Sequence, residues 1–343
     1  MSALDRTAIG AVDSQGMLDD VLQQSHQLED ALWRAESAGI DAIDAPGGLV
    51  VCGMGGSAIG GDLARGAIGD RARRPLVTAR EYAPPSWAGA DTLALCASYS
   101  GETEETLAAY AAAGDRGCRR VVVTTGGALA DAARSDGVPV IGVPSGMQPR
   151  AAVAYMTVAV LEVAARAGIT DSLRGEVEAA SALLRELASE WGPDGDPESQ
   201  PKSLARRLQG QVPVVYGAEL TAPVSVRWRS QLNENAEIPA FDGVLPEMDH
   251  NEICGWGQAT FTAIFLDDDE QHPRVKRRIE LTSEVVGAAG SPVARVGARG
   301  ASRVERVMSL VLLGDLASLY LAVLNGVDPS PVARLEDFKQ RLG

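Results

Sequence analysis

The chain has 343 residues, of which 45% are hydrophobic and 22% are charged, and it carries a formal net charge of −15 at pH 7. This composition is that of a globular protein, and the length suits two domains or one large domain. Because nucleic acids and anionic membranes are bound by clustered Lys and Arg, the acidic balance argues against both partners.

Cysteine usage and the apolar segments favour a cytoplasmic protein. The four cysteines have neither CxxC nor zinc-finger spacing, which is typical of buried thiols in a reducing compartment. The N-terminal segment has no basic stretch leading into an apolar core, so no signal peptide is expected. The longest apolar run, near 309–325, is interrupted by Gly314 and Asp315 and is expected to be too short to cross a bilayer.

Residues 1–40 are predicted to be mostly helical, because apolar residues recur there at three- and four-residue spacing. Short apolar runs then alternate with helical patterns, and these runs lie at 49–53, 92–100, 119–125 and 139–143. Strands of this length, separated by helices, predict βαβ units in a parallel sheet with helices on both faces. Two long helices, near 152–168 and 172–189, are expected to complete a first domain at 41–190.

The pattern restarts after residues 191–202, which contain three prolines, two glycines and three acids and are therefore expected to form a linker. The run VPVVYG at 212–217 echoes LVVCG at 49–53, and further strands are expected at 261–266 and 293–297. A long helix is expected to end at Gly326. The sequence thus predicts an α/β protein with two doubly wound parallel-sheet sandwiches, the second at 203–343.

A glycine-rich turn, GMGGSAIGGD at 53–62, follows the first predicted strand. A strand, a glycine-rich turn and a helix start place backbone N–H groups where an anion can bind the helix N-terminus. The spacing matches neither the GxGxxG fingerprint nor the P-loop, which argues against hydride transfer and nucleotide hydrolysis. Tight packing of the helix on the strand would explain the glycines equally well.

A hydroxyl-rich segment, SYSGETEET at 98–106, follows the next long strand. One or two hydroxyls at such a place would be ordinary helix N-caps. Four hydroxyls exceed what capping needs, and together with the N-terminal amides they can donate to phosphate oxygens. They are carried by Ser98, Ser100, Thr103 and Thr106.

This pair of segments resembles the sugar-phosphate site of the SIS (sugar isomerase) domain. With GMQPR (146–150), NENAEIPAF (233–241), HNEICGW (250–256) and DPSPVARLEDFKQRLG (328–343), it resembles the bifunctional phosphoglucose/phosphomannose isomerases of archaea and some bacteria. The resemblance implies two SIS domains and a homodimer. It implies interconversion of glucose 6-phosphate or mannose 6-phosphate with fructose 6-phosphate, without a metal or other cofactor.

The resemblance also assigns roles to individual residues. Glu234 is implied to move a proton between sugar carbons 1 and 2 through an enediol, and Arg150 to stabilise the enediolate. His250 is implied to open the sugar ring, in a site shared with the partner subunit, and Lys339, in the C-terminal tail, to assist at the ring oxygen. The phosphate group would be held by Gly56, Ser57, Ser98, Ser100 and Thr103.

The residues themselves fit these roles. Glu234 is predicted near the end of a helix that stops before Pro239, where a carboxylate is electrostatically disfavoured and so takes up a proton more readily. Arg227 is expected on the same helical face and could steady it. Lys339 is one of only three lysines in an arginine-rich chain.

Three acidic residues depart from the family pattern. Glu102 stands where the family usually has asparagine, and Glu237 and Asp249 stand where lysine and asparagine are common. These changes remove no catalytic group, but they are expected to affect substrate affinity.

Two alternatives stay open: an isomerase restricted to one epimer or to another aldose phosphate, and a SIS-domain regulator that binds a sugar phosphate without turnover. A regulator has no use for Glu234, His250 and Lys339 together, which favours the enzyme. A zinc-dependent mannose phosphate isomerase is excluded, because three scattered histidines offer no paired-histidine site.

Overall fold

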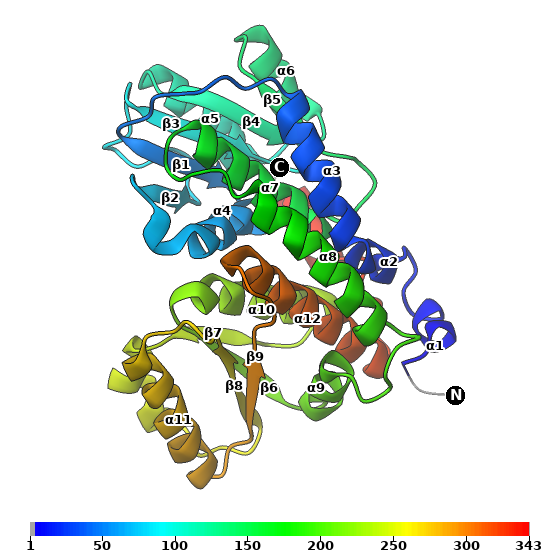
Figure 1. Ribbon diagram of the computed structural model, residues 1–343. Coiled ribbons are helices and arrows are strands. Elements are labelled where there is room, and N and C mark those ends of the chain that lie inside the picture. The colour runs from blue at the N-terminus through cyan, green and yellow to red at the C-terminus, as the bar shows by residue number, and fades with distance from the viewer. Residues whose placement is uncertain (1–3, 343) are drawn as a thin grey trace. The chain divides into compact units, whose positions relative to one another are not determined.

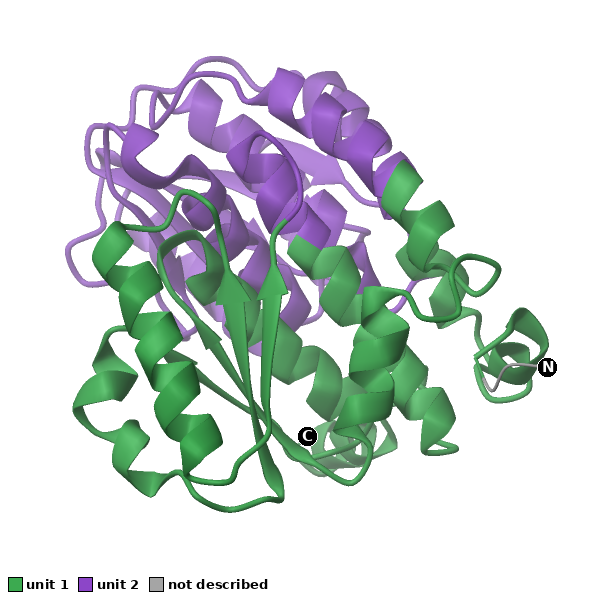
Figure 2. Ribbon diagram, turned by 60° about the horizontal axis from the view of Figure 1, so that its bottom comes forward, with its two compact units in different colours: residues 1–22, 186–298, 310–343 green, residues 23–185, 299–309 purple. Residues whose placement is uncertain are grey.

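The computed structural model describes residues 4–342, and the chain forms two compact units (Figure 2). The five-strand unit comprises Gln23–Arg185 and Arg299–Ser309. The four-strand unit comprises Met1–Leu22, Glu186–Ala298 and Leu310–Gly343. Two of the boundaries between the units fall within long helices, α8 (Arg174–Trp191) and α12 (Arg303–Leu324). The division expected from the sequence, into residues 41–190 and 203–343, is a different one and stays a prediction.

The five-strand unit contains a parallel sheet in the order β2-β1-β3-β4-β5 (Figure 1). Every residue of β1 and β3 is buried, as expected for central strands covered on both faces. The strands are β1 (Gly48–Gly53), β2 (Leu76–Ala79), β3 (Thr92–Ala97), β4 (Arg119–Thr124) and β5 (Val140–Gly142).

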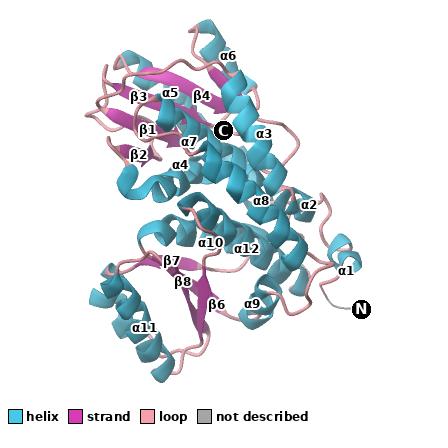
Figure 3. Ribbon diagram, viewed as in Figure 1, coloured by secondary structure: helices cyan, strands magenta, loops and turns pink. Residues whose placement is uncertain are grey.

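Helices cover both faces of this sheet (Figure 3). On one face, α5 and α6 pack on alternate strand residues such as Val50 and Cys96. On the other face, α4 packs on Val51, and α7 and α3 pack behind it. The helices are α3 (Gln24–Ser37), α4 (Gly55–Ile68), α5 (Glu104–Asp115), α6 (Gly127–Ser135), α7 (Val153–Arg166) and α8 (Arg174–Trp191), the last of which ends in the four-strand unit.

The four-strand unit contains a parallel sheet in the order β7-β6-β8-β9. In chain order this is the arrangement of β2-β1-β3-β4, so the two sheets share one topology and the second lacks a fifth strand. The strands are β6 (Val212–Gly217), β7 (Phe241–Val244), β8 (Phe261–Asp267) and β9 (Val293–Gly297). The helices are α1 (Arg6–Gly10), α2 (Met17–Leu22), α9 (Gln200–Leu208), α10 (Ala222–Asn235), α11 (Pro273–Ala288), α12 (Arg303–Leu324), which begins in the five-strand unit, and α13 (Ala333–Leu342).

The predicted α/β class with two parallel sheets is confirmed, and two strands were missed. β2 has four residues, begins after Pro75 and is only half buried, so it has no long apolar run. β7 is an edge strand of sequence FDGV, in which Phe241 and Val244 are exposed. Edge strands carry a weak apolar pattern because one side faces solvent.

The expectation that the apolar run near 309–325 is too short to cross a bilayer was wrong. It belongs to α12, a helix of 22 residues that is long and apolar enough to cross a membrane. In the structure, however, 94% of its most apolar window is buried within the protein, and Asp315 inside it is ion-paired with Arg227. These are features of a core helix.

Part of the expected linker at 191–202 is ordered around a buried lysine. Trp191 closes α8, and residues 200–202 form the first turn of α9. The ammonium group of Lys202 donates to the carbonyl oxygens of Pro193 and Asp196, at 3.2 Å each, and lies 5.9 Å from the ring centre of Tyr320. Burial lowers the pKa of Lys202, and the nearby carbonyl groups and ring compensate the cation.

Lys202→Met is therefore expected to lower the free energy of unfolding by about 1–3 kcal/mol, because two carbonyl groups lose their donor while the apolar stem is kept. Urea unfolding of the wild type and the variant measures the difference. The matched control is Lys276→Met, since Lys276 donates to an exposed carbonyl group and its loss should cost about 0.5 kcal/mol or less. Equal losses in the two variants would contradict the role of Lys202.

Candidate active site

The carboxyl ends of β1 and β3 meet at the edge of the five-strand sheet, where Gly53 is paired with Ala97. The chain leaves β1 toward β2 on one side and leaves β3 toward β4 on the other. In open α/β sheets this reversal of strand order creates a crevice outside the strand ends, where ligands bind. Both sequence motifs proposed for phosphate binding lie directly after these two strands.

The glycines of the motif after β1 have two different roles. A Cβ atom on Gly60 would lie 2.7 Å from Met156 of α7, and one on Gly61 would lie 3.1 Å from Val51 of β1. These two glycines serve close helix packing. Gly56 instead faces the loop before α7, where a Cβ atom would lie 3.0 Å from the Pro149 carbonyl oxygen and 3.1 Å from Arg150 Cα.

The hydroxyl groups after β1 and β3 are brought together by hydrogen bonds. Ser57 Oγ accepts from the backbone N–H of Tyr99 at 3.0 Å, which ties the turn after β1 to the segment after β3. Ser98 Oγ accepts from the N–H of Gly101 at 3.0 Å and shares a hydrogen bond of 2.8 Å with Thr103 Oγ1. Ser57, Ser98, Ser100 and Thr103, with Gly56, form what we call the hydroxyl cradle.

The hydrogen bonds of the cradle leave hydroxyl protons available to a ligand. Ser57 and Ser100 use their oxygens as acceptors, from Tyr99 and from the Glu102 N–H at 3.2 Å, so their own protons are not consumed. The hydrogen bond between Ser98 and Thr103 uses the hydroxyl proton of one of these two residues, and the hydroxyl proton of the other is available. Within the described part of the chain, no side chain caps the N-termini of α4 and α5, so their first amide groups also point toward this edge. Such a set of neutral donors suits a phosphate group.

Glu102, the acid within the cradle loop, is held by the start of α6. Its Oε1 accepts from the backbone N–H of Ala128 at 2.8 Å, in the first turn of α6. A helix N-terminus stabilises a negative charge, so this carboxylate is partly compensated there.

Arg150 lies beside the cradle, in a short 3₁₀ helix at Pro149–Ala152. Its side chain is only 3% exposed, and its Nη1 lies 3.5 Å from Gln148 Oε1. The backbone contact with Gly56 fixes it next to the turn after β1. The five-strand unit thus brings together Arg150 and all five predicted phosphate-binding residues.

Glu234, His250 and Lys339 belong to the four-strand unit. Glu234 lies in the last turn of α10, half-buried, and the helix ends at Asn235, as the sequence predicts. The flanking asparagines hold this helix end. Asn235 donates to Ser318 Oγ at 2.9 Å, and Asn233 Oδ1 accepts from the Ala240 N–H at 2.9 Å.

A buried ion pair fixes α10 to α12. Arg227 donates from Nε and Nη2 to the two carboxylate oxygens of Asp315, at 3.1 and 2.8 Å, and both side chains are at most 2% exposed. Trp228 packs where Gly314 has no side chain, and its Nε1 donates to the Leu310 carbonyl oxygen at 2.8 Å. Arg227 therefore has a structural partner that the sequence did not suggest, and its steadying of Glu234 stays a prediction.

His250 ends a short 3₁₀ helix at Glu247–His250 and is exposed. Its neighbour Asp249 anchors this segment, because it accepts from Arg278 at 2.9 Å and from Thr282 at 2.7 Å. Lys339 is exposed on α13, which buries none of its residues. α13 is linked to the segment after Glu234 through Arg334 and Glu237, whose charged groups are 3.7 Å apart. Two of the three acidic residues that depart from the family pattern, Glu237 and Asp249, thus have partners in this unit.

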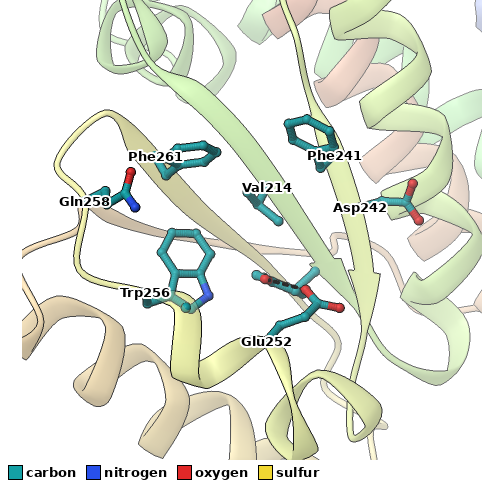
Figure 4. A pocket seen from close by; sticks show the side chains of 9 residues that line it. Val214, Phe241, Asp242, Glu252, Trp256, Gln258 and Phe261 are labelled. Carbon is teal, nitrogen blue, oxygen red and sulfur yellow. Dashed lines mark hydrogen bonds between the residues drawn. The ribbon is translucent and has the colours of Figure 1, made fainter.

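A pocket of about 500 Å³ lies beside the segment that carries His250 (Figure 4). Glu252 accepts a hydrogen bond of 2.8 Å from Tyr216, whose pKa is raised by burial and by this carboxylate, so the hydroxyl stays a donor. Trp256 packs edge-on against Tyr216, with ring centres 6.1 Å apart. The lining is aromatic and acidic and includes no Lys or Arg, so it does not suit a phosphate group.

The four-strand sheet has the corresponding crevice between the carboxyl ends of β6 and β8. A buried glutamine side chain occupies it. Gln271, which is 3% exposed, spans it with Nε2 at 3.3–3.4 Å from Thr221 Oγ1 and from the carbonyl oxygens of Ala218 and Leu266. Residues 267–270 beside it are all acidic. A run of acids disfavours a phosphate group, so this crevice differs from the hydroxyl cradle of the five-strand unit. Among residues 4–342, no group of three or more His, Cys, Asp or Glu side chains is arranged to hold a metal ion.

Comparisons with known proteins agree on the fold and the family. Residues 198–342 match the family model of the bacterial phospho-glucose isomerase C-terminal SIS domain. Among solved structures, a hypothetical protein from Thermus thermophilus has a TM-score of 0.77 at 17% identity and covers 98% of this chain and 92% of its own. A putative phosphosugar isomerase from Clostridium difficile 630 has a TM-score of 0.73 at 16% identity, with 95% and 98% covered.

Two sequence relatives are much more similar. The bifunctional phosphoglucose/phosphomannose isomerase of Caldicellulosiruptor bescii is 36% identical over 301 residues, which cover 86% of this chain and 89% of the relative. The protein of the same name from Aquifex aeolicus is 36% identical over 300 residues, covering 86% and 90%. The chain belongs to the bifunctional phosphoglucose/phosphomannose isomerase family.

Proposed function

We propose that this chain interconverts glucose 6-phosphate and mannose 6-phosphate with fructose 6-phosphate. Membership of the family supports the reaction. The structural observation that supports a sugar phosphate as substrate is the hydroxyl cradle at the crevice between β1 and β3. The cradle offers neutral hydroxyl and amide donors, which bind a phosphate group without selecting the sugar attached to it.

Glu234 is the proposed base. It removes the proton from carbon 2 of the open-chain aldose, and the electron pair of that bond forms the double bond of the enediolate while negative charge passes to the oxygen on carbon 1. The same carboxyl group returns the proton to carbon 1. The hydroxyl proton on carbon 2 passes to the negative oxygen on carbon 1, so that carbon 2 becomes the ketone and carbon 1 carries a hydroxyl group. Arg150 stabilises the enediolate, whose charge develops only during the reaction.

His250 and Lys339 act on the sugar ring in this proposal. His250 transfers the proton that opens the ring, and Lys339 assists at the ring oxygen. Both side chains are exposed on segments of the four-strand unit, which is compatible with groups that meet the substrate only when it binds.

Accepting both aldoses follows from the shared intermediate. Glucose 6-phosphate and mannose 6-phosphate differ in configuration at carbon 2, and removal of the carbon-2 proton gives the same enediol from either. The cradle anchors the phosphate group while carbon 2 presents its proton to the carboxylate after rotation about the bond between carbons 2 and 3.

The direct test is a coupled assay for fructose 6-phosphate, started from each aldose phosphate in the presence of EDTA. Activity with both substrates is expected, and Arg150→Ala should reduce kcat/KM for both by similar factors, because it meets their common intermediate. Binding of both sugar phosphates without turnover would instead indicate a regulator, and turnover of one epimer alone would indicate a restricted isomerase.

Glu234→Gln is expected to abolish isomerisation while sugar-phosphate binding stays nearly intact, since general base catalysis supplies about 10²–10⁴-fold in rate. Activity assays and calorimetric binding of fructose 6-phosphate separate the two effects. Glu237→Gln is the matched control, because Glu237 lies three residues further along and is exposed; it should keep most of the activity. Retention of more than about a tenth of the wild-type kcat in Glu234→Gln would rule it out as the base.

The active form in this proposal is a homodimer in which His250 serves the site of the partner subunit. The exposed position of His250, on a segment similar to one that the family lends across its dimer, supports this arrangement. Inactive Glu234→Gln protomers mixed with inactive His250→Ala protomers should therefore regain part of the activity. Exchanged heterodimers that stay inactive would argue against a shared site.

Glu102→Gln is expected to lower KM for glucose 6-phosphate about two- to fivefold at low ionic strength, because it removes a negative charge near the cradle and keeps an acceptor for the Ala128 amide. The difference should shrink at high salt, where exposed charges are screened. Steady-state kinetics at two salt concentrations measure it, with Asp131→Asn, an exposed acid on α6, as the control. A rise in KM would show that the negative charge of Glu102 favours binding.

A further inference from the structure

Tyr99 lies within the cradle, between Ser98 and Ser100, and is 8% exposed. Its backbone N–H donates to Ser57 Oγ at 3.0 Å, and its carbonyl oxygen accepts from the Thr125 N–H at 3.0 Å. The backbone of Tyr99 therefore joins the two halves of the cradle. Neither of these contacts depends on its side chain.

The side chain of Tyr99 reaches a different segment, the turn at residues 144–147. Its hydroxyl donates to the Pro144 carbonyl oxygen at 3.0 Å and accepts from the Met147 N–H at 2.9 Å. These two groups belong to the first and fourth residues of the turn, which an ordinary β-turn joins directly. The hydroxyl is inserted between them, so it sets how far apart the ends of the turn lie.

This turn leads directly into Arg150. Gly146 within it has φ +101°, a conformation that favours glycine, and the chain then enters the 3₁₀ helix at Pro149–Ala152. The Arg150 backbone rests against Gly56 of the cradle. Arg150 is thus held from one side by Gly56 and from the other by a turn whose width depends on Tyr99.

We propose that Tyr99 is a positioning residue for isomerisation, which fixes Arg150 relative to the bound phosphate group through the 144–147 turn. This inference rests on the proposed role of Arg150 at the enediolate. Because the backbone contacts of Tyr99 hold the cradle and its hydroxyl holds the turn, phosphate binding and enediolate stabilisation depend on different atoms of one residue.

Tyr99→Phe separates these two functions. Without the hydroxyl, the Pro144 carbonyl and the Met147 N–H must close on each other or take up water, and either change moves the turn. We expect kcat with glucose 6-phosphate to fall about tenfold, the effect of one or two hydrogen bonds, while KM and inhibition by inorganic phosphate change less than about twofold. The matched control is Tyr110→Phe, since Tyr110 is buried in the same unit and its hydroxyl donates to Asp136 at 2.9 Å, away from the turn; its kcat should not change.

A double-mutant cycle with Arg150→Ala tests whether Tyr99 acts through Arg150. If it does, Tyr99→Phe should change kcat less than about twofold in the Arg150→Ala background, because the group it positions is absent. Equal losses in both backgrounds, or a weakened affinity for inorganic phosphate, would overturn the inference and indicate a general structural role. If Tyr99→Phe keeps the full kcat while Arg150→Ala is slow, the inference on Tyr99 is wrong and the proposed function stands. If the wild-type protein has no isomerase activity, the proposed function itself is wrong.

Discussion

The parallel pairing of β1 with β3 is the constraint on which the candidate site depends. Because Gly53 is in register with Ala97, two loops that are some forty residues apart in the chain begin side by side. Ser57 can then accept from Tyr99, and the hydroxyl cradle forms from two separate loops. A slip of the strand pairing by one residue would turn every side chain to the other face and separate these partners.

The two sheets share a topology but differ at the carboxyl ends of their central strands. In the five-strand unit this place holds small hydroxyl residues and uncapped helix N-termini. In the four-strand unit it holds Gln271 and a run of acids. The second unit instead supplies a helix end that is pinned by Asn233 and Asn235 around Glu234. The repeated fold therefore fixes where a site can form, and local side chains decide which chemistry each copy carries.

Much of the fold could be predicted because its central strands are buried on both faces and appear as continuous apolar runs, whereas β2 and β7 are short edge strands and could not be recognised. The clustering of Ser57, Ser98 and Thr103 was predictable, since both loops follow neighbouring parallel strands. The pairing of Arg227 with Asp315 and the reach of Tyr99 to the 144–147 turn were not, because they join segments that no local pattern relates. Their only sequence signals are an acid inside an apolar helix and an aromatic residue within a hydroxyl-rich motif.

The anchoring of Glu102 by the Ala128 amide has an evolutionary consequence. An acid at residue 102 is tolerable while a backbone N–H at residue 128 holds it. A proline at residue 128 has no such group and would leave the Glu102 carboxylate without this partner. Substitutions at these two positions are therefore expected to be coupled, because a change at residue 128 alters the surroundings of the Glu102 carboxylate even if residue 128 never touches the substrate.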